Sequence, residues 1–306
     1  MLKYLLQRLA LAAATLWFIA TLVFCSARLT GDPTHWLLPE DAPPQARQEL
    51  RESLGLDRPL LAQYGTYLTG LIRGQVATSY YEPRPVREIL MERLPNTLRL
   101  AGLALAGTWL FGLLLGGLAA VNHNGVLDRT IVAVASLVSA VPSFVVAIGM
   151  ILMFSVVLRI LPTSGTGTWR NLVMPVATLT LLGAAGLVRL VRGSLLETLD
   201  QDFVRTARAK GLRRWGTVGK HAMRNAAIPL LTVFGTQLGA LVAGTVVVET
   251  VFAWPGLGRA IVAAVNTRDF PLLQTSILLV SGTVIACNLL VDLLYPMVDP
   301  RVRLGG

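Results

Sequence analysis

Six apolar runs constrain this chain more than any other feature of its sequence. A membrane-spanning helix needs roughly 20 mostly apolar residues. Runs of about that length or longer cover residues 9–29, 97–121, 130–160, 172–191, 228–251 and 272–296. The third run is longer than a span requires and contains Pro142, which predicts a kink or a tilt. The sequence therefore predicts an all-α, polytopic membrane protein with six transmembrane helices.

The composition agrees with this class. Of the 306 residues, 54% are hydrophobic and only 14% are charged, whereas soluble chains carry about a quarter charged residues. The net charge of +10 could indicate a nucleic-acid partner, but the basic residues alternate with the apolar runs instead of forming one patch. We therefore expect contact with membrane lipid and no binding of nucleic acid.

The distribution of basic residues predicts the orientation. Arginines and lysines cluster around the loop between the fourth and fifth runs, and such short loops face the cytoplasm. Six spans then place both termini in the cytoplasm. We divide the chain into the N-terminus with the first transmembrane helix (1–29), an outward-facing loop region (30–96), a five-helix transmembrane core (97–296) that includes a cytoplasmic loop (193–227), and a cytoplasmic tail (297–306). The first run has no small-residue cleavage site, so it is predicted to be a membrane helix rather than a signal peptide.

Motifs for catalysis or metal binding are missing from the sequence. The segment Gly216-Thr-Val-Gly-Lys220-His221 lacks the spacing and the hydroxyl residue of a Walker A motif. The three histidines fall in three different loops, and both cysteines fall inside apolar runs. We expect neither an enzyme nor a metal site, and any energy must come from an ion gradient or from a separate ATPase.

The cytoplasmic loop is the most informative stretch. Asp200 or Asp202 can cap a helix that Gly211 ends, with Lys210 in its last turn. A helix of roughly ten residues is too short to be stable alone in water, so it must pack on something. Two interpretations follow: a solvated basic loop that obeys the positive-inside rule, or a docking helix that enters a groove on a partner protein. The spacing favours the docking helix.

This loop resembles the coupling motif of ABC importer permeases. Arg205-Thr206-Ala207 occupies the E-A-A positions and Gly211 the glycine position, with His221 ten residues later. The glutamate is absent, but R-T-A-R-A-K-G followed by H-x-x-R-N is typical of the peptide and nickel permease family. Further motifs of that family recur in order: Gly31-Asp32-Pro33, Leu54 to Pro59, Glu249 to Arg259, Arg268-Asp269 with Pro271 and Gln274, Asn288 to Asp292 with Tyr295, and Asp299-Pro300-Arg301.

The resemblance implies a type I ABC importer permease fold in the bacterial inner membrane. It implies that residues 30–96 are a periplasmic loop region, that residues 97–296 are the permease core, and that residues 193–227 are its cytoplasmic coupling loop. It implies import of dipeptides or oligopeptides, a heterodimer with a second homologous permease, two ATP-binding subunits and a periplasmic or lipid-anchored substrate-binding protein. It also implies that this chain binds no cofactor, because ATP and Mg belong to the ATPase subunits. Residues expected at the ATPase interface are Phe203, Arg205, Thr206, Ala207, Arg208, Lys210, Gly211, His221, Arg224 and Asn225.

Other cargoes and other transport classes remain as alternatives. The same architecture could import nickel, another metal chelate or glutathione, and the short segment Leu161-Pro162-Thr163 resembles the outer loop of glutathione and nickel permeases. An ion-driven secondary transporter or channel would need buried ionisable residues at mid-membrane and inverted repeats. An intramembrane enzyme would need a catalytic pair at one depth. Neither pattern is visible in the sequence.

A second candidate site lies directly after the fifth run. It is predicted to form an outer gate or a contact for the binding protein. Its residues are Phe252, Trp254, Pro255, Gly256, Gly258 and Arg259. Trp254 is alternatively an interfacial aromatic that anchors at the lipid headgroups. Glu249 and Asp292 lie near predicted helix ends, where solvation or structural pairing is the favoured interpretation.

Small residues recur every four positions along the fifth run, at Gly235, Gly239 and Ala243. Such a stripe allows close approach between helices. It predicts either packing within the chain or an interface with the second permease that lines the pore. Gly112 and Gly116 in the second run present the same two alternatives.

Overall fold

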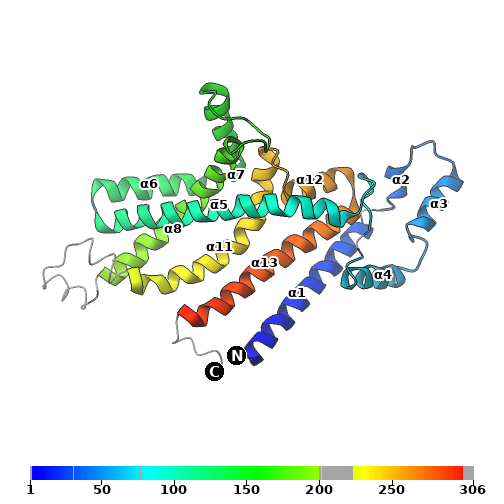
Figure 1. The fold of residues 1–306 in the computed structure, drawn as a ribbon, viewed down its shortest axis with the longest axis horizontal. Helices are drawn as coiled ribbons and strands as arrows, with labels where there is room; N and C mark the ends of the chain where they lie inside the picture. Colours follow the sequence, from blue (N-terminus) through cyan, green and yellow to red (C-terminus); the bar gives the residue numbers. More distant parts are fainter. Residues whose placement is uncertain (1, 30, 76, 200, 202–222, 299–306) are drawn as a thin grey trace. The chain divides into compact units, whose positions relative to one another are not determined.

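The computed structural model describes residues 2–29, 31–75, 77–199, 201 and 223–298 (Figure 1). Its elements are α1 (Leu2–Leu29), α2 (Thr34–Leu37), α3 (Pro44–Ser53), α4 (Leu60–Ile72), α5 (Val86–Val121), α6 (Val126–Ala140), α7 (Ser143–Met150), the π-helix η1 (Ile151–Val157), α8 (Arg170–Leu199), α11 (Met223–Val251), α12 (Leu257–Thr267) and α13 (Phe270–Val298). No β-strand forms among the described residues, where a single bridge pairs Thr78 with Pro85. The all-α prediction is confirmed.

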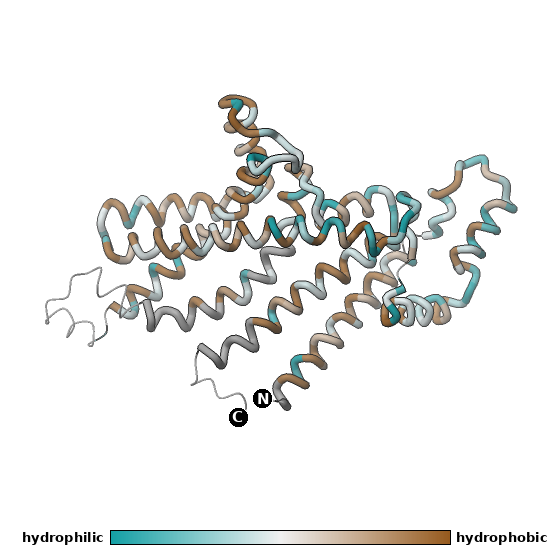
Figure 2. The backbone as a smooth tube through the Cα atoms, in the orientation of Figure 1, coloured by the Kyte–Doolittle hydropathy of each residue, from teal (hydrophilic) through white to brown (hydrophobic). Residues whose placement is uncertain are grey.

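Four helices in the described part of the chain are long and apolar enough to cross a bilayer: Leu5–Leu29, Val86–Val121, Arg170–Leu199 and Phe270–Leu290. The bent pair Val126–Ala140 and Ser143–Val157 makes a fifth if it is counted as one span. Helix α11, with 29 residues, has the length to be a sixth. Each predicted run thus coincides with one of these elements, and Figure 2 shows hydrophobic residues along them.

The third run breaks at Pro142. Helix α6 ends at Ala140, Val141 and Pro142 adopt extended backbone conformations, and α7 begins at Ser143. A residue that precedes proline is disfavoured in the helical region because the proline ring clashes with it. The two helices meet at 105°, so the predicted kink is confirmed and is a complete break.

The chain divides into two compact units. Unit 1 comprises residues 1–95 and 259–282, and unit 2 comprises residues 96–258 and 283–306. In unit 2, α8 packs against α6, α7 and α11. Leu187, Val191 and Leu195 of α8 are fully buried and form a core with Leu230 of α11. Helix α8 is therefore the central element of this unit.

Glycines bring α5 close to α8. A Cβ atom on Gly112 would lie 2.5 Å from Leu187 Cδ2, and one on Gly116 would lie 2.7 Å from Val191 Cβ. On α11, a Cβ atom on Gly239 would lie 3.0 Å from Val284 Cγ1 of α13. These three glycines thus serve packing within the chain. Gly235 is buried, and the side chain of Ala243 lies outside the described set.

In unit 1, α1 and α4 pack through aromatic side chains. The ring of Phe24 on α1 stacks on Tyr67 of α4 at 5.4 Å and lies 5.2 Å from Tyr64, whose hydroxyl is 2.6 Å from the Thr21 hydroxyl. Helix α4 therefore lies along the last turns of α1. Helix α3 has no buried side chain, and Figure 2 shows hydrophilic residues along it.

The start of α13 belongs to the same unit and is capped by Asp269. Its Oδ1 accepts a hydrogen bond from the Leu272 backbone N–H at 3.2 Å, which satisfies a free donor of the first helical turn. The Ser79 hydroxyl donates to the other carboxylate oxygen of Asp269. The preceding residue, Arg268, places its guanidinium 3.9 Å from the centre of the Trp36 ring. These contacts fasten α2 and the segment after α4 to the beginning of α13.

Candidate functional site at the end of α11

Helix α11 ends in a tight turn. Ala253 has a φ of 52°, the left-handed conformation that commonly closes a helix, and the Trp254 N–H donates to the Glu249 carbonyl at 2.8 Å. After this turn α12 begins at Leu257. Residues 252–256 therefore form a short, tight connection between α11 and α12.

A buried carboxylate organises this turn. Glu249 is fully buried, which is costly for an ionisable group unless it is hydrogen-bonded. The Thr97 hydroxyl of α5 donates to Glu249 Oε1 at 2.6 Å and accepts from the Leu257 N–H at 2.8 Å. One hydroxyl thus links the carboxylate of α11 to the first N–H of α12.

Asn96 makes the second link between the turn and α5. The Trp254 indole N–H donates to the Asn96 carbonyl at 3.1 Å, and the Asn96 side-chain amide donates to the Pro255 carbonyl at 3.0 Å. These two bonds run in opposite directions between the same two segments. The turn is consequently held to α5 by both Asn96 and Thr97.

Two glycines allow the turn to close over the carboxylate. A Cβ atom on Gly256 would overlap the Glu249 carboxylate, and one on Gly258 would lie 2.5 Å from Val246 Cα. Any larger residue would push the turn away from α11. The glycines of this predicted motif therefore have a packing role.

The predicted outer-gate residues are mostly buried. Phe252 and Trp254 expose 1% and 2% of their surface and pack with Leu100 and Val248 in one apolar cluster. The prediction that Trp254 anchors in the headgroups is wrong, because its ring is covered by this cluster and its N–H is already bonded. Pro255 is half-buried and Arg259 is exposed. The expected structural pairing of Glu249 is confirmed, whereas the side chain of Asp292 lies outside the described set.

Asn96 and Thr97 are two site residues that no motif in the sequence predicted. Their signal is a polar pair that directly follows Pro95 at the beginning of a long apolar run. That signal identifies no partner, because Glu249 lies 152 residues away.

Residues 202–222, the middle of the predicted coupling loop 193–227, fall outside the described residues, whereas its two ends belong to α8 and α11. The residues concerned are Phe203, Arg205, Thr206, Ala207, Arg208, Lys210, Gly211 and His221. Arg224 and Asn225 belong to α11, but their side chains are outside the described set. The helices on either side of the loop, α8 and α11, pack directly on each other.

An ion pair joins α6 to α8 seven residues before α8 ends. Arg192 Nε lies 2.6 Å from Asp128 Oδ1, and Arg192 Nη2 donates to Oδ2 at 2.9 Å. The Asn124 N–H also donates to Oδ2 at 2.9 Å. One turn earlier, Arg189 donates to the Ser139 hydroxyl at 2.8 Å. This bidentate arrangement fixes the loop between α5 and α6 to the helix that leads into residues 202–222.

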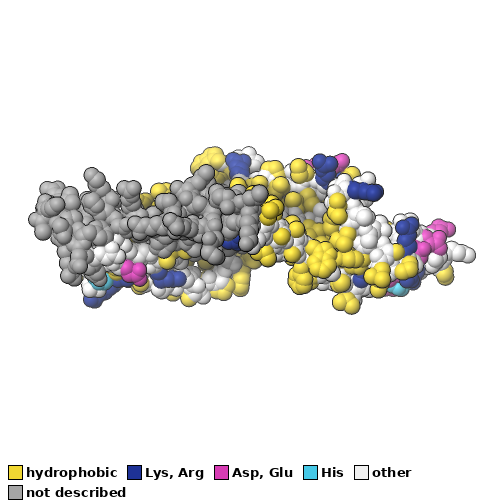
Figure 3. All heavy atoms as spheres, turned by 90° about the horizontal axis from the view of Figure 1, so that it is seen from below, with side chains coloured by type: hydrophobic (Ala, Val, Ile, Leu, Met, Phe, Trp, Pro, Cys, Tyr) yellow, Lys and Arg dark blue, Asp and Glu magenta, His cyan; other side chains and the backbone are white. Residues whose placement is uncertain are grey.

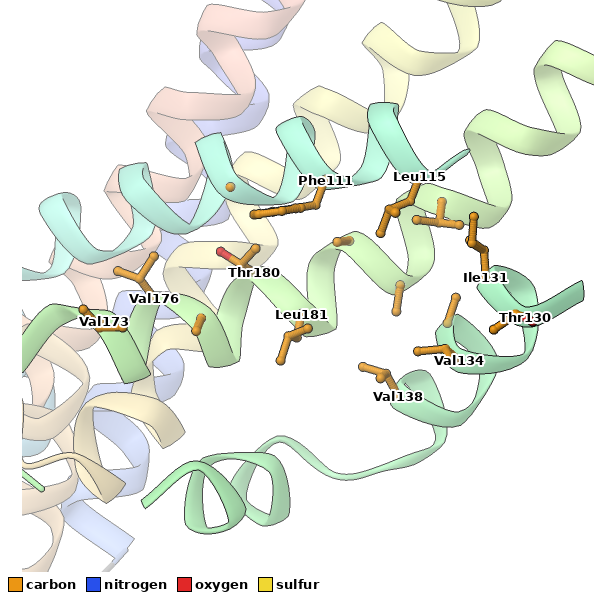
Figure 4. Close-up of a pocket in the computed structure, with 16 residues that line it drawn as sticks. Phe111, Leu115, Thr130, Ile131, Val134, Val138, Val173, Val176, Thr180 and Leu181 are labelled. Atoms are coloured by element: carbon orange, nitrogen blue, oxygen red, sulfur yellow. The ribbon is translucent and has the colours of Figure 1, made fainter. Parts of the chain in front are cut away.

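A wide apolar groove of about 650 Å³ lies between α5, α6 and α8. Figure 4 shows Phe111, Leu181 and Val138 facing it from the three helices. Among the described residues that line it, Thr130 and Thr180 alone carry polar side-chain groups. A peptide with charged ends would lose its hydration there without compensation, so this groove does not suit such a cargo.

Comparison with known proteins gives a consistent result. A family model described as "Binding-protein-dependent transport system inner membrane component" matches residues 112–304, and the model of the corresponding N-terminal region matches residues 1–101. The glutathione transport system permease protein GsiC of Pectobacterium atrosepticum is 40% identical over 306 residues, which cover 99% of each chain. The protein of the same name from Salmonella typhimurium is 41% identical, also with 99% of each chain covered.

Among solved structures, a chain of the inward-facing MetNI methionine ABC transporter superposes with a TM-score of 0.59. The match covers 70% of this chain and 97% of that chain, at 20% sequence identity. This likeness shows the fold, which is that of a type I ABC importer permease.

Proposed function

The chain belongs to the family of binding-protein-dependent transport system inner membrane components, and on that premise we propose that its complex imports small peptides, with glutathione as the first cargo to test. The chain is a permease subunit of an ABC importer and carries no ATPase chemistry of its own. The cargo proposal is supported by relatives named glutathione transport permeases, at about 40% identity over essentially the whole chain. A metal-ion cargo is less well supported, since the described residues contain no cluster of three potential ligands.

The complex that we propose contains two non-identical permeases, two ATP-binding subunits and a substrate-binding protein. ATP and Mg would be held by the ATP-binding subunits. The basic residues around 193–227 support a cytoplasmic position for this loop, and hence for both termini.

We further propose that the segment Arg205–Gly211 docks on an ATPase and that α11 carries the movement across the membrane. Helix α11 has 29 residues, which at 1.5 Å per residue make a rod of about 43 Å. It begins at Met223, directly after the loop, and ends in the turn that Thr97 and Asn96 hold to α5. A displacement at the loop would therefore be delivered to α5 and α12, which gives the turn 252–258 its role as an outer gate. The locked turn is the observation that carries this mechanism.

Transport by the reconstituted complex tests the cargo proposal. The four kinds of subunit are placed in vesicles, and uptake of labelled glutathione, a dipeptide and Ni²⁺ is measured with and without ATP. We expect uptake of glutathione that needs both ATP and the binding protein. ATP-dependent uptake of Ni²⁺ with no uptake of either peptide would contradict the proposal.

A further inference from the structure

Unit 1 contains a polar cavity of about 500 Å³ between α1, α4 and the first turns of α13. Three arginines line it, Arg28, Arg58 and Arg73, and no aspartate or glutamate is among its lining residues. Asp32, an acid that interacts electrostatically with Arg28, has partners of its own in Arg51 at 3.4 Å and the Thr34 hydroxyl at 2.8 Å. A cleft lined by charges of one sign concentrates ions of the other sign. The cavity is therefore suited to an anion.

Two buried donors in this cavity lack hydrogen-bond partners among the described residues. They are the Arg28 Nε–H and the Tyr67 hydroxyl. Burial raises the pKa of Tyr67 to about 12, so at neutral pH this hydroxyl keeps its proton and can donate it. Buried polar groups without partners are rare because each one costs free energy. Both residues line the same cavity, so an anionic oxygen group bound there is a candidate partner for these donors.

The cavity also offers an acceptor. Gln63 donates its amide to the Arg58 carbonyl at 2.7 Å, while its Oε1 is buried and unpartnered in the described part of the chain. A ligand that carries both an anionic group and a hydroxyl matches this set. Phosphate beside a hydroxyl is found in the headgroup of phosphatidylglycerol.

The position of the cavity points to a membrane surface. Arg28 precedes the last residue of the apolar span Leu5–Leu29, and Pro271, Gln274 and Thr275 lie in the first turns of the span Phe270–Leu290. Two spans that end at one cavity place it where hydrocarbon meets water, which is the depth of lipid phosphates. Tyrosines are enriched at this depth, and Tyr67 and Tyr80 both line the cavity.

Apolar side chains lie exposed on the same elements. Leu29 of α1 is 88% exposed, and Leu61 and Ile72 of α4 are 85% and 86% exposed. Figure 3 shows hydrophobic side chains over much of the surface outside the grey atoms. Side chains of this kind would contact the acyl chains of a lipid whose headgroup is bound.

We propose that this cavity binds the headgroup of an anionic phospholipid, with its phosphate on Arg28 and Tyr67 and a headgroup hydroxyl on Gln63. The site is independent of the cargo proposed above, because none of the residues that define it belongs to the turn after α11 or to the coupling loop. Lipid bound at this site would hold α4 and the start of α13 against α1.

The test uses the purified complete complex, stripped of lipid in detergent. Its thermal unfolding midpoint is followed while phosphatidylglycerol, phosphatidylcholine or inorganic phosphate is added. We expect saturable stabilisation by phosphatidylglycerol alone. Equal stabilisation by inorganic phosphate would identify a free-anion site, and equal stabilisation by phosphatidylcholine would indicate unspecific solvation by lipid; either result would overturn the proposal.

Variants locate the site. Arg28→Gln and, separately, Tyr67→Phe should weaken the binding of phosphatidylglycerol, Arg28→Gln by about tenfold or more, since hydrogen bonds to charged groups are strong. Tyr67→Phe retains the ring that stacks on Phe24, so it tests the hydroxyl even if Arg28→Gln fails to fold. The matched control is Arg47→Gln, the same loss of charge in unit 1 at a residue that lies outside the cavity lining and bonds to the Glu40 carbonyl. Wild-type affinity in Tyr67→Phe together with a loss in Arg47→Gln would refute the assignment.

Discussion

The Thr97 hydroxyl donates a 2.6 Å hydrogen bond to Glu249 across 152 residues of sequence, and both side chains are fully buried. The same hydroxyl accepts from the Leu257 N–H, so three helices meet at one oxygen atom. Any movement of α11 must either carry α5 and α12 with it or break these bonds. This relationship supports the mechanism proposed for the outer turn, and substitutions at these residues can test it.

Removal of the Thr97 hydroxyl should destabilise the protein. Thr97→Val preserves the shape of the side chain but leaves the Glu249 carboxylate and the Leu257 N–H without this partner, which typically costs about 1–3 kcal/mol. The free energy of unfolding in detergent gives the measurement. Thr130→Val is the control, because Thr130 is exposed and its hydroxyl donates to the Val126 carbonyl within its own helix. Equal losses in the two variants would show that the buried network contributes nothing specific.

Adjacent glycines on α5 should respond in opposite directions to the same substitution. A Cβ atom on Gly116 would lie 2.9 Å from the Val188 carbonyl oxygen, whereas one on Gly117 would meet nothing within 4 Å. We expect Gly116→Ala to force α5 from α8 at a cost of about 1–3 kcal/mol. Gly117→Ala should be neutral or stabilise by up to about 1 kcal/mol, because alanine favours a helix. Comparison of thermal midpoints distinguishes them, and similar midpoints would contradict the packing described for α5 and α8.

The Asp128–Arg192 ion pair should show strong non-additivity. The Asp128 side chain is 3% exposed and that of Arg192 is 26% exposed. Arg192→Gln leaves a buried carboxylate without its cation, and we expect a loss of about 3 kcal/mol. The double variant Asp128→Asn/Arg192→Gln should be more stable than Arg192→Gln alone, since it removes the uncompensated charge.

A double-mutant cycle of unfolding free energies measures this coupling, with Arg129→Gln on an exposed position of α6 as the control for loss of charge. A coupling energy near zero would mean that the pair behaves as a surface ion pair and contributes nothing measurable to the free energy of unfolding.

Substitutions in the loop between α8 and α11 should uncouple ATP hydrolysis from transport. A bulky charged side chain, as in Ala207→Arg or Gly211→Arg, would block the docking of a short helix on its ATPase. We expect ATP-driven uptake by the reconstituted complex to be abolished, whether or not basal hydrolysis persists. Gln45→Arg on the exposed helix α3 controls for added charge. Full uptake in both loop variants would reduce the loop to a charged connector and end the coupling proposal.

Sequence alone determined the class of this protein and the places of its long apolar helices. Hydropathy is summed over contiguous residues, so a run of roughly 20 apolar residues identifies a span without knowledge of its neighbours. A proline also acts on the residues next to it, so the break at Pro142 could be predicted from the sequence. The motif from Glu249 to Arg259 was also recognisable, because its residues are consecutive.

Only the tertiary structure decided what those residues contact. Sequence analysis left the stripes of small residues open between packing and interface, and the structure assigns Gly112, Gly116 and Gly239 to packing within the chain. Trp254 was expected as a possible headgroup anchor, yet it is buried against Leu100 and bonded to Asn96. Glu249 was recognised as a charge near a helix end, but its partner Thr97 was not. Contacts of this kind depend on which faces of distant helices meet, and a pattern within one segment carries no information about the face of another.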